Sequence, residues 1–348
     1  MSTVARHLAV MGTSLALAVS APTRPIALEA SEAAVRAVEA AERLLSTWRD
    51  ASPLARLNAA PPDAPQEVPE ELYVVLKRVF EWRERTAGAF DPTVAPLVRV
   101  WGIRTGGRLP TPAELHAARL ATGVSLFSFE ESLPSPVPSS NGSDSGRVLA
   151  VVRRDGAAGI DEGAWGKGWA LDRAAVAARA AGATSLVLDL GGQVLAWGEE
   201  RTIGVAHPRD RTRTVVTLRL ADASASTSGN SERGHVVTGR RIGHLLDPRT
   251  GEPAPDFGSV TVVAPSGLVA DILSTAFFVL GPRDGLAASA RLRVEGVAHE
   301  TLFFLEGEEG NGLQVALSPG MRQLVALAPT SLDLDLSHSK KSSKGARP

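Results

Sequence analysis

Two oxygen-bearing side chains, Asp271 and Thr275, stand four residues apart in the segment VADILSTAF. On an α-helix this spacing places both of them on one face. Their oxygens suit magnesium, which takes one or two carboxylates and completes its octahedron with carbonyls, water and phosphate oxygens. A solvated helix face or a local hydrogen bond is the alternative. The apolar residues around both positions favour the metal site, because a buried carboxylate requires a partner.

Lys167 lies in a glycine-rich segment, IDEGAWGKGWALD (160–172), that leads into a helix. Glycine allows close backbone approach, and exposed amides at a helix N-terminus together with an ammonium group suit a phosphate. The segment is not a Walker A loop, because Gly163 is too close to Lys167 and no Ser or Thr follows the lysine. A glycine-rich turn beside a solvated lysine is the alternative interpretation.

His244 stands at the start of GHLLDPRTGEP (243–253), which is rich in turn residues. Histidine exchanges a proton near neutral pH, and the rigid turn behind it would hold the ring in place. His244 is therefore a candidate general base, with a structural histidine as the alternative. Farther upstream, Gly191 and Gly192 follow a strand-like run and allow close approach of either a ligand or another strand.

Apolar residues at three- and four-residue spacing predict the helices that position these groups. We expect helices over 30–48, from Pro69 to near Gly88, over 168–180 and over 268–280. The first of them would bury Trp48 on its apolar face. Short β-branched runs predict strands at 185–190, 259–264, 301–306 and 313–317. Strands and helices that do not alternate regularly indicate an α+β fold, with a single domain over residues 1–330.

The remaining segments carry weaker patterns. Residues 133–146 are poor in apolar side chains and rich in Pro, Ser and Gly, so we expect a mobile surface loop. The polar tail, 331–348, is expected to be disordered. The apolar stretch at 7–21 is interpreted as a first strand. A secretory signal is the alternative, although Gly12 and Thr13 interrupt its apolar run.

The composition excludes several classes of function. The net charge of −1 arises from 37 basic and 38 acidic residues that are interspersed, so no long-range field favours nucleic acid or anionic lipid. Because the chain has no cysteine, disulfides, thiolate metal sites and a thiol nucleophile are excluded, and any metal must bind oxygen or histidine. The apolar N-terminal stretch is shorter than the roughly 20 residues of a membrane span, so no integral membrane segment is expected.

In order and in wording, these segments resemble the ApbE family, the FAD-dependent protein flavin transferases. The similar motifs cover nearly the whole chain: MGTS (11–14), LLSTWRDASPLARLN (44–58), GAFDPTVAPLVRVWG (88–102), IDEGAWGKGWALDR (160–173), LDLGGQVLAWG (188–198), ASASTSGNSERG (223–234), GHLLDPRTGEP (243–253) and VADILSTAFFVLG (269–281). The resemblance implies a single T-fold-like α+β domain with mixed or antiparallel sheets, flanking helices and an FAD cleft.

The resemblance also implies roles for particular residues. Met11 and Trp48 would contact the flavin or adenine rings, and Ala89, Phe90 and Asp91 would line the cleft. Asp161 and Lys167 would bind the nucleotide, and His244 and Leu245 would close over it. Magnesium would be bound by Asp271, Thr275 and the backbone carbonyl of Ala164. Position 48 is Trp where many relatives carry Tyr, which keeps the stacking face and changes the polar group at its edge.

The expected activity is magnesium-dependent transfer of the FMN half of FAD to a Ser or Thr hydroxyl of an acceptor protein, with release of AMP. Magnesium would stabilise the charge that develops on the diphosphate, and His244 or Asp271 would take the proton of the acceptor hydroxyl. The resemblance implies acceptors among the subunits of membrane redox complexes or among flavin-dependent reductases. Hydrolysis of FAD to FMN and AMP, and a non-catalytic flavin carrier, are the alternatives. We expect a cytoplasmic location, because few residues precede Met11, and export to the periplasm is the alternative.

Overall fold

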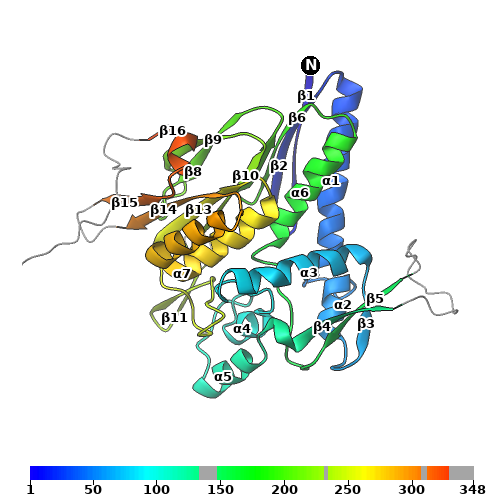
Figure 1. The fold of residues 1–348 in the computed structure, drawn as a ribbon, viewed down its shortest axis with the longest axis vertical. Coiled ribbons are helices and arrows are strands. Elements are labelled where there is room, and N and C mark those ends of the chain that lie inside the picture. The colour runs from blue at the N-terminus through cyan, green and yellow to red at the C-terminus, as the bar shows by residue number, and fades with distance from the viewer. Residues whose placement is uncertain (133–146, 231–233, 307–311, 329–348) are drawn as a thin grey trace, which may run out of the picture.

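The computed structural model describes residues 1–132, 147–230, 234–306 and 312–328. The loop expected at 133–146 and the tail at 331–348 lie outside these described residues. A large sheet runs through the structure, with its long helices against one face (Figure 1). The α+β fold class predicted from the sequence is confirmed.

The large sheet has eight strands, and every neighbouring pair is antiparallel. Its spatial order is β1 (Ser2–Val10), β2 (Thr13–Ala21), β6 (Ser185–Leu190), β7 (Gln193–Trp197), β10 (Ala223–Gly229), β13 (Gly258–Ala264), β14 (Glu300–Glu306) and β15 (Leu313–Leu317). The four strands predicted from β-branched runs correspond to β6, β13, β14 and β15. They are confirmed to within one residue.

Alternate residues of each strand enter different hydrophobic clusters, as the two-residue period of a strand requires. On β14, Phe303 belongs to the cluster beneath the helices, whereas Leu302 and Phe304 belong to the cluster on the other face. That second face is covered by a small sheet of β16 (Val325–Leu327), β9 (Thr214–Leu220) and β8 (Arg201–Ala206). The part of the large sheet from β7 to β15 is therefore buried on both sides.

Three long helices cover the first face, and α1 and α6 lie side by side (Figure 1). They are α1 (Arg24–Leu45), α6 (Gly166–Ala180) and α7 (Gly267–Val294). The helix predicted over 30–48 is α1, but it ends at Leu45, where Ser46 takes an extended ψ of 118°. The burial predicted for Trp48 is wrong, because this residue lies beyond the helix and its exposed fraction is 68%.

The helix predicted over 268–280 is the first part of α7. At Gly281 the backbone takes a φ of 75°, Pro282 follows, and a second helical segment continues to Val294. Proline removes a backbone donor and glycine is free to take this conformation, so the pair produces a kink. The sequence therefore predicted the end of the first segment correctly and missed the second.

The apolar stretch at 7–21 contributes to two strands rather than one. β1 and β2 form a hairpin whose turn is made by Met11, with a φ of 53°, and Gly12, with a φ of 68°. Both strands belong to the large sheet, so the strand interpretation of this stretch is confirmed, with two strands in place of one. No helix among the residues the structure describes is long and apolar enough to cross a membrane.

The remaining elements, apart from one short helix, lie together at one end of the structure (Figure 1). They are α2 (Pro53–Ala59), α3 (Glu70–Arg85), α4 (Ala95–Val100), α5 (Pro112–Leu120), the sheet of β3 (Pro65–Glu67), β5 (Val148–Arg153) and β4 (Phe127–Ser132), and the hairpin of β11 (Gly234–Val237) and β12 (Arg240–Gly243). The exception is α8 (Met321–Leu324), which contacts β9, β14 and β16. The helix predicted behind Pro69 is α3, with Glu70 and Glu71 in its first turn, where carboxylates are favourable.

The strand registers bring several turns together. The β1–β2 turn, the β6–β7 turn at Gly191 and Gly192, and the end of β10 at Gly229 all lie at the same end of the sheet. Segments that are distant in the sequence therefore meet at this end.

Candidate active site

A cavity of about 780 Å³ opens where these turns meet. All but one of the residues predicted for the site line it: Trp48, Ala89, Phe90, Asp91, Asp161, Ala164, Lys167, His244, Leu245, Asp271 and Thr275. Met11 instead lines an adjoining cavity of about 500 Å³. Residues common to both walls are Thr13, Trp48, Arg104, Gly163 and Lys167, so the two cavities are neighbours along one surface.

Asp271 is the buried charge of this site, with an exposed fraction of 3%. Its carboxylate accepts hydrogen bonds from the Lys167 ammonium, with Nζ 3.1 Å from Oδ1 and 3.3 Å from Oδ2, and from the Gly168 N–H at 3.0 Å. The Ser226 hydroxyl lies 3.4 Å from Oδ1. The solvated-face interpretation of Asp271 is therefore wrong. The cationic partner that a buried carboxylate requires is Lys167.

The position of Lys167 depends on a backbone contact between α6 and α7. A Cβ on Gly168 would lie 2.0 Å from the carbonyl oxygen of Gly267, so only glycine fits where the two helix N-termini meet. Asp172 of α6 fixes the crossing, because its carboxylate accepts from the N–H groups of Gly267 at 2.6 Å and Leu268 at 3.1 Å. This contact sets the distance between Lys167 and Asp271.

Asp271 and Thr275 lie one turn apart on α7, and both face the cavity that Ala164 also lines. A carboxylate, a hydroxyl and a nearby backbone carbonyl are the hard oxygen donors that magnesium prefers. Among the described residues, no group of three or more His, Asp or Glu side chains could hold a metal on its own. A metal with a single protein carboxylate, completed by phosphate oxygens and water, fits this donor set.

The wall at Ala89, Phe90 and Asp91 is rigid. Asp91 is 4% exposed and pairs with Arg83, whose Nε lies 2.8 Å from Oδ2, while Oδ1 accepts from the Thr93 N–H at 2.8 Å. The negative charge of Asp91 is thus compensated inside the protein. Its main effect is to hold the turn that presents the backbone of Ala89 and Phe90 to the cavity.

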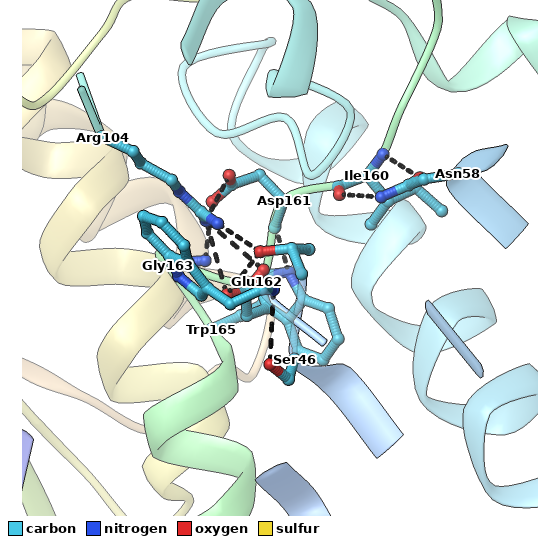
Figure 2. A network of polar contacts seen from close by, with 10 residues as sticks. Ser46, Asn58, Arg104, Ile160, Asp161, Glu162, Gly163 and Trp165 are labelled. Carbon is cyan, nitrogen blue, oxygen red and sulfur yellow. Dashed lines mark hydrogen bonds and ion pairs between the residues drawn. The ribbon is translucent and has the colours of Figure 1, made fainter. Parts of the chain in front are cut away.

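Arg104 joins the site although the sequence analysis did not identify it. Figure 2 shows its guanidinium directed at Asp161 and Glu162, with Nη2 2.6 Å from Asp161 Oδ2 and 3.4 Å from Glu162 Oε1. Its Nη1 donates to the Thr47 hydroxyl. Burial, and then the charge of Asp161, raise the pKa of Glu162 to about 7 against the opposing effect of Arg104. Glu162 was also missed.

His244 and Leu245 directly follow β12 and line the cavity. The turn behind them forms as predicted: the Gly251 N–H donates to the carbonyl of Asp247 at 2.7 Å, and the Asp247 carboxylate pairs with Arg249 at 2.8 Å. The predicted turn is therefore confirmed. Its rigidity fixes the backbone that carries His244.

Further wall residues come from segments whose chemistry the sequence did not reveal. They are Thr13, Ser14, Asp189, Arg211, Thr227, Ser228 and Gly229. Gly191 and Gly192, which the sequence analysis did identify, also line the wall. The Ser228 hydroxyl donates to Ser274 at 3.0 Å, and Ser274 donates to Ser226 at 3.1 Å, so β10 is linked to α7 beneath Asp271. The polar run ASASTSG on a buried strand was the signal that could have identified this network.

Comparisons with known proteins identify relatives of this chain. Residues 11–298 match the ApbE family. The chain is 30% identical over 292 residues to the FAD:protein FMN transferase of Salmonella typhimurium, covering 81% of this chain and 78% of that protein. It is 32% identical over 256 residues to the protein of the same name from Treponema pallidum, covering 69% and 68%.

Solved structures show the same architecture. The ApbE protein of Thermotoga maritima superposes with a TM-score of 0.80 at 29% identity, over 93% of this chain and 99% of that one. The flavinyl transferase ApbE of Pseudomonas stutzeri superposes with a TM-score of 0.75 at 25% identity, over 94% and 98%. The family match over most of the sequence and the shared fold together show that this chain belongs to the ApbE family and is a transferase.

Proposed function

We propose that the chain is a magnesium-dependent FAD:protein FMN transferase, which moves FMN from FAD to a Ser or Thr hydroxyl of an acceptor protein and releases AMP. The observation that carries this proposal is the buried Asp271 carboxylate beside the Lys167 ammonium, in a cavity that Thr275 and Ala164 also line. This arrangement offers hard oxygen donors to a divalent cation and a positive charge to a diphosphate. The two relatives named above are FAD:protein FMN transferases by name, which supports the transfer but not its metal or its acceptor residue.

In the proposed complex, Asp271, Thr275 and the carbonyl of Ala164 would hold magnesium, and Lys167 would bind oxygens of the diphosphate. The bound metal supplies charge stabilisation for the phosphate oxygens. Met11 and Trp48 offer apolar faces to the rings, while Ala89, Phe90, Asp91 and Leu245 shape the walls and Asp161 helps bind the nucleotide. These roles rest on the lining of the two adjoining cavities.

The transfer is a displacement at phosphorus. The acceptor hydroxyl oxygen forms a bond to the phosphorus of the FMN half, the bond from that phosphorus to the bridging oxygen breaks, and AMP leaves with the bridging oxygen. His244 takes the proton of the hydroxyl. His244 is favoured over Asp271 as the base, because the Asp271 oxygens already accept from Lys167 and Gly168.

Mass spectrometry separates this function from its two alternatives. The chain is co-expressed with candidate acceptor subunits of redox complexes, and the same experiment is run with Asp271→Asn. Transfer predicts an acceptor whose mass rises by one FMN residue only with the unmodified chain. FMN and AMP formed from FAD and magnesium without any acceptor would instead indicate hydrolysis. Tight FAD binding without any turnover would indicate a carrier.

The acceptor and the cellular location also remain proposals. We propose acceptors that present a Ser or Thr hydroxyl on a flexible or exposed segment, since that oxygen has to enter the cavity to reach the diphosphate. We propose a cytoplasmic location, and fractionation of cells that express the chain would test it against export.

A further inference from the structure

Arg104 occupies the boundary between the two cavities of the site. Its side chain lines both of them and is about one-quarter exposed. It contacts two segments far from it in the sequence: Thr47 and Trp48 after α1, and Asp161 and Glu162 before α6. A single guanidinium therefore connects the loop that carries Trp48 with the loop that carries Asp161.

The Trp48 ring has the properties of a ligand-binding surface. It is 68% exposed, it lines both cavities, and it lies outside the hydrophobic clusters of the described residues. The Arg104 guanidinium lies over its face, with Cζ 5.3 Å from the ring centroid. Large aromatic side chains exposed next to a cavity are typical of binding sites, because a planar ligand can cover them.

Arg104 also changes the charge that such a ligand would meet. Asp161 and Glu162 place two carboxyl groups at the boundary. Their negative charge would repel the phosphate groups of a nucleotide, although Asp161 can still accept hydrogen bonds from its other parts. The guanidinium contacts both carboxylates, at 2.6 Å and 3.4 Å. It is a planar, permanently charged group that can pair with carboxylates at its edge while its face contacts an aromatic ring.

We propose that Arg104 is a positioning residue for FAD, which holds the Trp48 ring in place so that one planar heterocycle of the dinucleotide stacks on it, and which shields the diphosphate from Asp161 and Glu162. This inference rests on the proposed function for the identity of the ligand. The adenine and the isoalloxazine share the chemistry required, a flat aromatic ring joined to a phosphate, and the experiment below distinguishes them.

The test measures FAD affinity by flavin fluorescence in magnesium, without any acceptor. Arg104→Met is expected to weaken FAD binding about tenfold, which corresponds to roughly 1.4 kcal/mol. Arg104→Lys should recover part of this loss, because it keeps the charge and loses the planar face. Arg108→Met is the matched control, since Arg108 lies on the same loop and pairs with Glu114 at 2.7 Å, yet it lines neither cavity. It should bind FAD as the unmodified chain does.

A double-mutant cycle shows whether Arg104 acts through Trp48. Trp48→Leu alone should weaken FAD binding, and adding Arg104→Met should then have less effect than it has in the unmodified chain. Trp48 is exposed, so its replacement leaves the fold intact and keeps the test available if Arg104→Met folds poorly. Thermal melts of all variants identify losses that are due to unfolding.

Competition with AMP and with FMN shows which ring of FAD, the adenine or the isoalloxazine, stacks on Trp48. The half whose affinity falls in Arg104→Met is the half that stacks on Trp48. Unchanged FAD affinity in Arg104→Met or in Trp48→Leu, equal losses in Arg108→Met, or full additivity in the cycle would overturn the inference. A chain that binds FAD with these differences and yet transfers no FMN would refute the proposed function alone, so the two failures are distinguishable.

Discussion

Replacing Lys167 by Met should have opposite effects on the two ligands of the site: tighter magnesium binding and weaker FAD binding. In the structure the Lys167 ammonium contacts both oxygens of Asp271, at 3.1 and 3.3 Å. A metal that uses Asp271 as a ligand must compete with this ammonium for the same carboxylate. Lys167 is therefore a competitor of the metal and, in the proposed complex, a partner of the diphosphate.

The magnitude follows from the burial of the pair. Two unit charges 4 Å apart attract by about 4 kcal/mol at an effective dielectric constant of 20. The Asp271 side chain is 4% exposed, but that of Lys167 is 28% exposed, so the ammonium regains hydration when it leaves and much of that energy is offset. A net 1–2 kcal/mol, or about 5- to 30-fold tighter magnesium binding in Lys167→Met, is the expected result.

Calorimetric titration with magnesium at pH 8, without nucleotide, measures this change. Lys77→Met is the matched control, because Lys77 pairs with Glu131 at 3.5 Å and lines neither cavity of the site. It should bind magnesium as the unmodified chain does. Magnesium affinity that is unchanged or weaker in Lys167→Met would refute the competition, and FAD affinity that does not fall would refute the diphosphate contact.

Three further predictions test other parts of the site. His244→Asn should lower the rate of FMN transfer by about 10²- to 10⁴-fold in single-turnover assays while FAD still binds, as expected for a general base; a normal rate would assign the proton to another group. The Glu162 pKa of about 7 lies above its usual 4.5, so the folded chain keeps a proton that the unfolded chain releases, and stability is lost as pH rises from 4.5 to 7. In the unmodified chain the free energy of unfolding should fall by at most about 3 kcal/mol over this pH range, and in Glu162→Gln it should not. Urea unfolding of both chains without ligands measures this difference, and identical pH profiles would contradict the prediction. Gly168→Ala should lower the melting temperature and reduce magnesium affinity, because its Cβ meets the Gly267 carbonyl, whereas Gly156→Ala, with open space around it, should leave both unchanged.

The residues that the sequence identified correctly are those whose role follows from the spacing of neighbouring residues. Asp271 and Thr275 were found because a four-residue spacing on a predicted helix fixes a shared face before any tertiary contact is known. The strands at 185–190 and 259–264 were found because β-branched runs ended by glycine or proline are local features.

What the sequence missed depends on contacts between distant segments. Arg104 lies in a turn, and its partners Thr47 and Asp161 are each 57 residues away, so no local spacing relates them. The β1–β2 hairpin was interpreted as one strand because its turn uses Met11 at a positive φ, a conformation usually signalled by Asn, Asp or Gly. Trp48 continued the helical period of α1 although the backbone had already left the helix.

The order of the wall segments along the chain has a consequence for folding. The cavity walls run from Thr13 on the second strand to Thr275 on the last long helix, with contributions from the segments between them. Contacts of such sequence separation form late, since loop closure has to precede them. A partly folded chain therefore presents no nucleotide site. FAD that binds only the completed fold raises the free energy of global unfolding, so its binding stabilises the N-terminal hairpin and the C-terminal strands together.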